Sequence, residues 1–331
     1  MKLTFLGTSA GAPTLRRNVS GIALQFDQRR EWWLFECGEG TQHQLQKTDL
    51  SLAALRRVFI SHLHGDHCFG LVGLLASRGL NGGTEAVDLY GPPGLADYVN
   101  SIRRTTGTRV PYPFEIHEIN DDGLVFEDDE YRVFAARVLH AGSTLAFSIA
   151  EKDRAGRFKI EEAQGLGIPP GPVYSRLKRG ETVTLGDGRV VDGAVLVDPP
   201  RTGRKLVVVS DTKDASALLP FAEAADVVIH EATYAAVDTE LAKQNAHSTA
   251  TDAARFAARA SAKQLIMTHF SPRYEQRGEG LITVADLVAE AEREFVAGRV
   301  LAAKDFMRYE IKSLKREPEQ PKEIISNLNP I

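Results

Sequence analysis

Cysteine, long apolar runs and excess charge of either sign are all scarce in this sequence of 331 residues. The two cysteines, Cys37 and Cys68, are too few for a disulfide framework, and no CxxC pair indicates a zinc knuckle. Lys and Arg together number 40, against 44 Asp and Glu. This balance excludes a chain coated with basic residues for nucleic-acid binding, although a local basic patch stays open.

No stretch approaches the roughly 18 apolar residues that a membrane helix needs. The N-terminal residues also lack the apolar segment of about 7–15 residues that marks a signal peptide. We therefore expect a soluble, cytoplasmic protein with reduced thiols and no membrane partner. At about 150 residues per domain, the length predicts two domains or one large α/β domain.

Short β-branched runs alternate with alanine-rich segments, which is typical of a layered α/β fold. The predicted strands include Lys2–Leu6, Arg57–Ile60, Arg132–Val138, Ala194–Val197, Lys205–Val209, Val227–Ile229 and Gln264–Met267. The predicted helices include Thr41–Lys47, Phe69–Arg78, Gly94–Thr105, Ala250–Ala260 and Ile282–Phe295. Either Ser248 or Thr249 is available to cap the helix that starts near Ala250.

Residues 151–193 interrupt this alternation. They are rich in Gly and Pro, which predicts neither a regular helix nor a central strand. Between positions 152 and 189, eight Lys or Arg residues stand against five Asp or Glu residues. A solvated surface hairpin and a protruding basic arm that grips a polyanion are both compatible with this composition. We expect one main domain over 1–312 that carries this segment as an insertion, followed by a flexible tail over 313–331.

The strongest chemical signal is the sequence Ser61-His62-Leu63-His64-Gly65-Asp66-His67. It begins where the apolar strand Val58-Phe59-Ile60 ends, and functional loops of α/β sheets lie at such strand ends. Imidazoles suit zinc, and the carboxylate adds a negatively charged ligand. The motif therefore predicts a metal site.

Three more ligand candidates each follow a predicted strand: His140, Asp211 and His269. Seven ligands are too many for one ion, so the set predicts two. In this interpretation His62, His64 and His140 hold one ion, Asp66, His67 and His269 hold the other, and Asp211 bridges them. Two such ions activate water and stabilise charge on a phosphoryl group, which defines a two-metal hydrolase. A single structural zinc fits less well, because structural sites favour four ligands, commonly with Cys.

Several further motifs extend this pattern. They are Phe5–Thr14, Cys37-Gly38-Glu39-Gly40-Thr41-Gln42, Ile229-His230-Glu231-Ala232-Thr233-Tyr234, His247-Ser248-Thr249 and Thr268-His269-Phe270-Ser271-Pro272-Arg273-Tyr274. With these motifs the sequence resembles the metallo-β-lactamase superfamily and, within it, the ribonuclease Z family, from Met1 to about Tyr309. His-Ser-Thr followed by Thr-His-Phe-Ser is the most discriminating part.

The resemblance implies an αββα sandwich with two zinc ions per subunit. It implies an endoribonuclease that cuts precursor tRNA 3′ of the discriminator base, leaving a tRNA 3′-hydroxyl and a trailer with a 5′-phosphate. It also implies a homodimer whose arm holds the tRNA, and it favours the basic-arm interpretation of residues 151–193. The expected RNA contacts in the arm are Arg176, Lys178 and Arg179.

The resemblance also assigns roles to individual residues. His247 is expected to act in catalysis, not as a ligand, by assisting the leaving 3′ oxygen; on the sequence alone it could simply adjoin a helix start. Asp66 is expected to orient water as well as bind metal. Glu36 is expected to brace the metal loop. Independently of the resemblance, His230 and Glu231 follow the strand Val227–Ile229 and are expected to fix a ligand imidazole or His247 by a hydrogen bond. Arg16 and Arg17 match a loop that approaches the RNA end, or form a solvated turn.

Two other functions stay open at this point. A different metallo-β-lactamase-fold phosphodiesterase or esterase, acting on small substrates, would share the two ions and need no basic arm. A catalytically silent RNA-binding scaffold would be expected to lose some of the seven ligands, and none is missing here.

Overall fold

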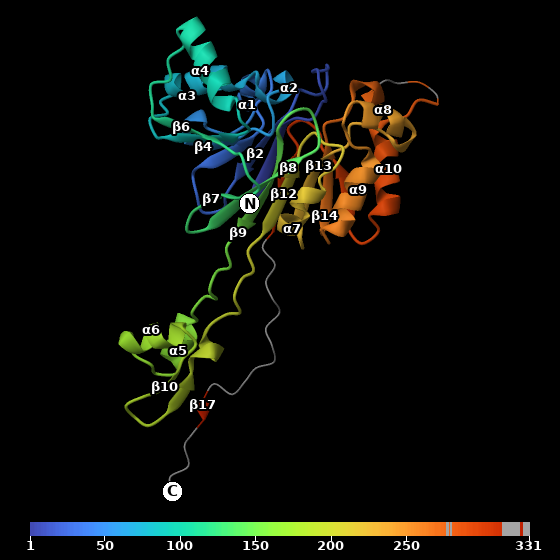
Figure 1. The fold of residues 1–331 in the computed structure, drawn as a ribbon. Coiled ribbons are helices and arrows are strands. Elements are labelled where there is room, and N and C mark those ends of the chain that lie inside the picture. Colours follow the sequence, from blue (N-terminus) through green and yellow to red (C-terminus); the bar gives the residue numbers. More distant parts are fainter. Residues whose placement is uncertain (276–277, 279, 313–324, 327–331) are drawn as a thin grey trace. The chain divides into compact units, whose positions relative to one another are not determined.

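Two seven-stranded sheets form the centre of the larger of two compact units, residues 1–150 and 204–312 (Figure 1). The computed structural model describes residues 1–275, 278, 280–312 and 325–326. The first sheet has the order β16 (Arg308–Glu310), β1 (Lys2–Gly7), β2 (Gly21–Gln25), β3 (Trp32–Phe35), β4 (Leu55–Phe59), β5 (Val87–Gly91) and β6 (Phe114–Glu118). The second has the order β15 (Arg299–Ala302), β14 (Gln264–Thr268), β13 (Val227–Glu231), β12 (Lys205–Val209), β9 (Thr144–Glu151), β8 (Tyr131–Val138) and β7 (Gly123–Glu127).

Both faces of each sheet are buried, which explains the nearly continuous apolar runs of the central strands. In β12, Leu206 and Val208 belong to one core cluster and Val207 and Val209 to another, because successive side chains point to opposite faces. The first cluster also contains residues of the other sheet, such as Phe59. The two sheets therefore pack face to face.

Helices cover the outer face of each sheet. On the first sheet the outer core includes residues of α3 (Leu71–Leu80) and α4 (Leu95–Thr106). On the second it includes α9 (Ala250–Arg259) and α10 (Val284–Glu294). The short helices are α1 (Thr41–Leu45), α2 (Gly65–Cys68), α7 (Leu219–Ala222) and α8 (Thr239–Gln244). The predicted αββα sandwich is confirmed. Within the described residues, none of the helices has the length and apolar character needed to cross a membrane.

The strand directions bring several carboxyl ends to one edge of the second sheet. β12, β13 and β14 are mutually parallel. β9 is antiparallel to β12. β8 is the other neighbour of β9, and only five residues connect the two, too few for a parallel crossover, so β8 runs the same way as β12. In the first sheet, β3 and β4 are parallel. The loops that follow these strands carry the candidate ligands.

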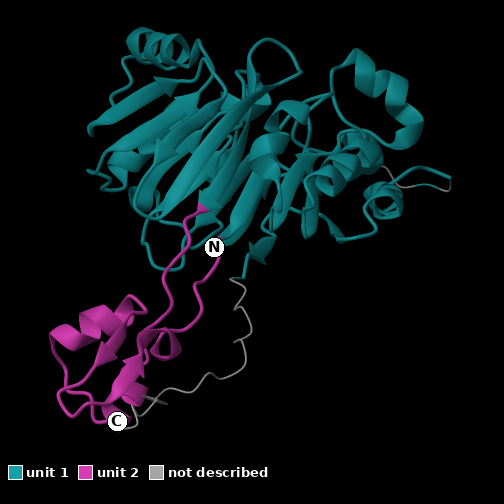
Figure 2. Ribbon diagram, turned by 60° about the horizontal axis from the view of Figure 1, so that its bottom comes forward, with its two compact units in different colours: residues 1–150, 204–312 teal, residues 151–203, 313–331 magenta. Residues whose placement is uncertain are grey.

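Residues 151–203 form a smaller unit (Figure 2). This unit has its own apolar core, which includes Phe158, Leu177 and Val183. Its elements are α5 (Ile160–Gly165), α6 (Pro172–Lys178), a hairpin of β10 (Thr182–Thr184) and β11 (Val190–Asp192), and a 3₁₀ turn, η2 (Gly193–Leu196). The two-residue strand β17 (Ile325–Ser326) pairs with β11. Apart from β17, the tail expected over 313–331 lies outside the described residues.

Two predictions for this smaller unit were wrong. The Gly/Pro-rich stretch does contain a helix, because Pro172 occupies the first turn of α6, where its missing N–H costs no hydrogen bond. The expected strand Ala194–Val197 is mostly the turn η2, which starts where the Asp192 side chain accepts a hydrogen bond from the Ala194 N–H.

We expect Phe59→Ala to lower the free energy of unfolding by about 3–5 kcal/mol, because it leaves a cavity in the core between the sheets. The Phe59 ring stacks between Phe35 and Tyr90, with centroids 4.9 and 5.0 Å away. Urea denaturation followed by tryptophan fluorescence measures the change. Leu80→Ala, at an exposed position, is the control and should stay within about 0.5 kcal/mol. A similarly small loss for Phe59→Ala would contradict this assignment of the core.

Candidate metal centre

Four of the predicted ligands form one compact group: His62, His64, His140 and Asp211. Their candidate donor atoms all lie within 4.8 Å of one another. The Nε2 atoms of His62 and His140 are each 3.7 Å from Asp211 Oδ2. His64 Nδ1 lies 3.0 Å from His62 Nε2 and 3.4 Å from His140 Nε2. These donors therefore surround one small space.

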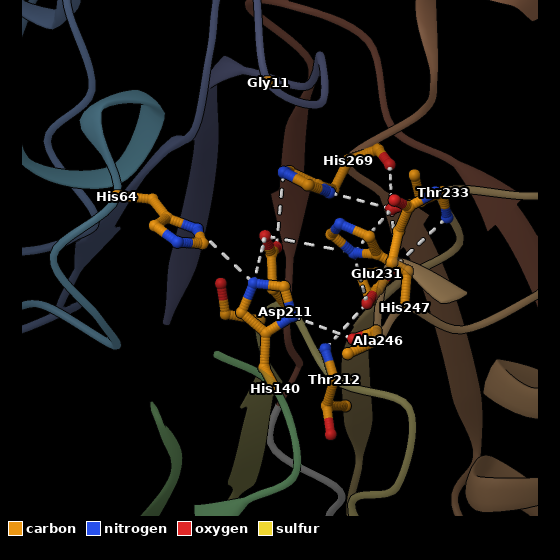
Figure 3. Close-up of polar contacts among 12 residues, drawn as sticks. Gly11, His64, His140, Asp211, Thr212, Glu231, Thr233, Ala246, His247 and His269 are labelled. Carbon is orange, nitrogen blue, oxygen red and sulfur yellow. Dashed lines mark hydrogen bonds and ion pairs between the residues drawn. The ribbon is translucent and has the colours of Figure 1, made fainter. Parts of the chain in front are cut away.

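Asp66, His67, Asp211 and His269 form the second group. His67 Nε2 is 3.4 Å from both Asp66 Oδ2 and Asp211 Oδ2. His269 Nε2 is 3.3 Å from Asp66 Oδ2 and 3.2 Å from Asp211 Oδ1. Asp211 belongs to both groups, so all seven predicted ligands meet around its carboxylate. Figure 3 shows four of them, His64, His140, Asp211 and His269.

The donor spacing fits metal ions. Ligands about 2.0–2.1 Å from a tetrahedral zinc lie about 3.3 Å apart, close to the separations of 3.0–3.7 Å found here. Among the described residues, His67 Nε2 and Asp211 Oδ1 are buried without a hydrogen-bond partner. Leaving such atoms unpartnered is costly, and a cation placed among them would remove that cost. The residues thus fit divalent metal ions.

Charge in the cluster also favours a cation. Burial lowers the pKa of His62 to about 2 and lowers that of His140 as well, so both present neutral imidazoles. Burial alone would raise the pKa of Asp211, but the imidazoles of His269 and His67 hold it well below its usual range. Conversely, burial alone would lower the pKa of His67, whereas the nearby carboxylate of Asp211 raises it well above the ordinary value. The second group, which contains Asp211 and His67, therefore attracts positive charge.

In four of the histidines predicted as ligands, a neighbouring group contacts the second ring nitrogen. His62 Nδ1 is 2.9 Å from the Ser61 hydroxyl, and His140 Nδ1 is 2.8 Å from the carbonyl oxygen of Ala246. His67 Nδ1 lies 3.3 Å from the Ser210 hydroxyl and 3.5 Å from Glu36. Such contacts orient a ring and leave its other nitrogen free for a metal.

The fourth contact joins His269 to the Glu231 network. The Thr233 hydroxyl donates to Glu231 and accepts from His269 Nδ1 at 2.9 Å. Glu231 also accepts from the backbone N–H of Thr212 at 2.7 Å. Glu36 plays a similar role on the other sheet, where it accepts from the Ser61 N–H at 3.2 Å. Of the three residues expected to brace the ligands, Glu36 and Glu231 are therefore at the centre.

The third residue, His230, is directed elsewhere. Its Nδ1 lies 2.7 Å from the Glu231 carbonyl oxygen, and its ring faces Phe256 of α9 at 5.4 Å. Consecutive residues of β13 point to opposite faces, so His230 enters the outer core while Glu231 enters the site. Within the described part of the chain no hydrogen bond joins His230 to a ligand.

His247 lies at the rim of the centre, and its side chain is 14% exposed. Its Nδ1 is 3.0 Å from Glu231 Oε1, and its ring lies 4.8 Å from that of His140 (Figure 3). Burial alone would lower its pKa, but the hydrogen bond and charge of Glu231 raise it to about 9. The Glu231 carboxylate therefore favours the protonated form of His247. Thr249, two residues later, is the cap of α9.

Three residues at the centre have backbone angles in the left-handed region, which costs about 1–3 kcal/mol each for residues other than glycine. They are Glu36 (φ 60°), Ala246 (φ 56°) and His269 (φ 58°). Each lies beside a contact described above. The surrounding structure holds these strained segments in place and thereby positions the site.

The sequence interpretation missed one donor. The backbone N–H of Gly11 donates to Asp66 Oδ2 at 2.8 Å, from the loop after β1. The positive φ of Gly11, 71°, was not readable from a single sequence, although the motif Phe5–Thr14 contained the residue.

The five residues expected to contact RNA fall into two sets. Arg16 is exposed, but Arg17 is buried, and its guanidinium binds Glu275 Oε1 at 2.9 Å and Thr8 Oγ1 at 2.7 Å. This arrangement favours a structural role for Arg17. In the smaller unit, Arg176, Lys178 and Arg179 are all exposed on or beside α6. The first and last of them pair with Glu181 at 2.9 and 2.7 Å.

Two packed sheets between helix layers, with a His/Asp cluster at one sheet edge, define a metallo-β-lactamase-fold protein. In agreement, the structure resembles the metallo-β-lactamase-fold protein YhfI from Bacillus subtilis, with a TM-score of 0.62 at 19% identity over 93% of this chain and 98% of that one. A family model described as anti-Pycsar protein Apyc1 matches residues 1–143.

Relatives with higher sequence identity show to which family of this fold the chain belongs. Ribonuclease Z of Nostoc sp. strain PCC 7120 is 51% identical over 318 residues, which cover 96% of this chain and 97% of that protein. Human tRNase Z, short form, superposes with a TM-score of 0.68 at 29% identity, over 94% of this chain and 100% of that one. The chain belongs to the ribonuclease Z family, and it is a hydrolase, an endoribonuclease.

Proposed function

We propose that this protein removes the 3′ trailer from precursor tRNA by cutting 3′ of the discriminator base, with two zinc ions per subunit. The tRNA would keep a 3′-hydroxyl and the trailer would carry a 5′-phosphate. The observation that carries the proposal is the convergence of seven ligands on Asp211, beside the His247–Glu231 pair, in a chain half identical to a ribonuclease Z.

The donor set supports zinc, since five of the seven ligands are imidazoles. His62, His64 and His140 would hold one ion, Asp66, His67 and His269 the other, and Asp211 both. When bound, the ions supply a water of lowered pKa and offset negative charge on the phosphoryl group. Asp66 accepts from Gly11, which fixes the carboxylate that would orient the attacking water.

His247 supplies what the ligands cannot, a proton for the leaving 3′ oxygen. Its Nδ1–H is directed at Glu231, which leaves Nε2–H for the substrate. The carboxylate of Glu231 favours the protonated imidazole, whose proton would pass to the leaving oxygen as charge develops there.

The exposed cations of α6 are the proposed RNA contacts of the smaller unit, together with Arg16 in the larger one. Arg176, Lys178 and Arg179 lie within four residues and would pair with backbone phosphates. A homodimer and a cytoplasmic location stay predictions from the family resemblance.

A cleavage map tests the proposal. End-labelled precursor tRNA is incubated with the purified protein in zinc or in EDTA, and bound zinc is counted by plasma emission spectrometry. We expect about two zinc ions per chain and one EDTA-sensitive cut after the discriminator. Intact RNA, with a metal-loaded protein that hydrolyses small phosphodiesters, would instead support the alternative small-substrate phosphodiesterase.

His247→Ala should reduce cleavage by about 10²–10⁴-fold and leave the zinc content unchanged, because the residue donates a proton and binds no metal. The matched variant Asp211→Asn should lose zinc and cleavage together. Single-turnover rates and metal analysis of both variants measure the difference. Loss of zinc from His247→Ala would refute its assignment.

Changing Arg176, Lys178 and Arg179 together to Gln should weaken precursor tRNA binding and flatten its salt dependence. With a slope of about −0.9 per phosphate contact, loss of three contacts reduces the slope of log K against log salt by about 2–3. Filter binding at several salt concentrations measures it. The control is a second triple variant, in which Arg132, Arg137 and Lys243 are changed to Gln; these residues are also exposed and ion-paired. Equal slopes in wild type and triple variant would contradict RNA binding by α6.

A further inference from the structure

One aromatic ring is left open to solvent beside the metal centre. The chain has 15 Phe, eight Tyr and two Trp residues, all in its described part. Among them only Phe69 and Phe306 are exposed, at 63% and 38%. A Lys47 ammonium covers the Phe306 ring, 5.5 Å from its centroid. Phe69, two residues after the ligand His67, is therefore the most available aromatic surface of the molecule.

The position of the Phe69 ring is set by its contact with Gly65 and by backbone hydrogen bonds on either side. A methyl group added at Gly65 would lie 2.4 Å from a ring carbon, so the ring lies directly over the turn that carries His64 and Asp66. The Phe69 N–H donates to the Gly65 carbonyl at 2.9 Å, and the next N–H, of Gly70, donates to Cys37 at 2.9 Å. The backbone on both sides is thus tied down while most of the ring faces solvent.

The other rings near the centre cannot offer a free face. Tyr234, whose centroid is 6.0 Å from that of His247, is 9% exposed, and its hydroxyl accepts from Asn245. Phe270, next to His269, is fully buried, with the Arg17 guanidinium 4.9 Å from its centroid. Tyr98, whose hydroxyl donates to the Cys68 carbonyl at 3.0 Å, is only partly exposed. Phe69 is therefore the most exposed aromatic ring that a base of a bound RNA meets here.

We propose that Phe69 is a substrate-binding residue whose ring stacks on the base of a nucleotide next to the scissile phosphate. The inference rests on the proposed function and deepens it. A phosphodiester held at the metal centre brings its flanking nucleotides to the rim, and unpaired bases at RNA ends are bound by stacking on aromatic side chains. Stacking tolerates any base, which suits an enzyme that must accept many tRNA ends.

The test combines Phe69 variants with substrates that lack one base. Phe69→Ala removes the ring, Phe69→Leu keeps apolar cover over Gly65 without a π face, and Phe69→Tyr keeps the ring. Leu80→Ala, at an exposed position at the other end of α3, is the surface control. Each protein is assayed on precursor tRNA, intact or with an abasic residue on either side of the cleaved bond.

For intact precursor we expect kcat/KM to fall about 5- to 150-fold in Phe69→Ala and clearly in Phe69→Leu, with Phe69→Tyr and Leu80→Ala near wild type. An abasic residue at the stacked position should slow the wild type by a similar factor. On that substrate Phe69→Ala should cause no further loss, because the two changes remove the same contact. Zinc content should be unchanged.

Three results would overturn the proposal while the proposed function stands: full activity of Phe69→Ala, equal losses on intact and abasic substrates, or loss of zinc. A change from dimer to monomer in Phe69→Ala, measured by light scattering, would also overturn the proposal. The ring would then pack against a second copy of the chain instead of binding RNA. Failure of the wild type to cut any precursor would overturn the proposed function itself.

Discussion

The centre depends on the buried carboxylate of Asp211. Four imidazoles lie within 3.2–3.7 Å of its oxygens, from His62, His67, His140 and His269. A buried carboxylate stays ionised only where positive charge or hydrogen-bond donors compensate for lost hydration. Both ligand groups share Asp211, so each loop at this sheet edge is positioned relative to this one side chain.

The rest of the larger unit holds the candidate ligands close together, although this arrangement is energetically unfavourable. His62 and His64 turn ring nitrogens toward each other, and Glu36, Ala246 and His269 have strained backbone angles. Such a cluster persists because rigid strands set its geometry, and metal binding would return free energy to the fold. The stacked rings of Phe35, Phe59 and Tyr90 join the neighbouring strands β3, β4 and β5 and supply part of that rigidity.

Much of the site could be predicted because its residues follow strands. The spacing of His62, His64, Asp66 and His67 is local, and His140, Asp211 and His269 each come directly after an apolar run. The burial of a side chain and the face to which it points could not be read from these patterns. Arg17 looks like a loop cation but is enclosed by Glu275 and Thr8, and His230 adjoins Glu231 yet points to the opposite face. The strand β9 was not among the predicted strands, although Leu145, Phe147 and Ile149 alternate with smaller residues along it.

Local patterns of residue type and spacing were enough to predict the αββα class, the family and the seven candidate ligands. Only the tertiary structure shows that the donor atoms of each group come within 4.8 Å of one another, that His247 Nδ1 lies 3.0 Å from Glu231, and that the Phe69 ring is exposed. These features depend on which strand ends meet at one edge and which face each side chain takes. Both result from sheet order and packing between residues as far apart in the chain as Asp66 and His269.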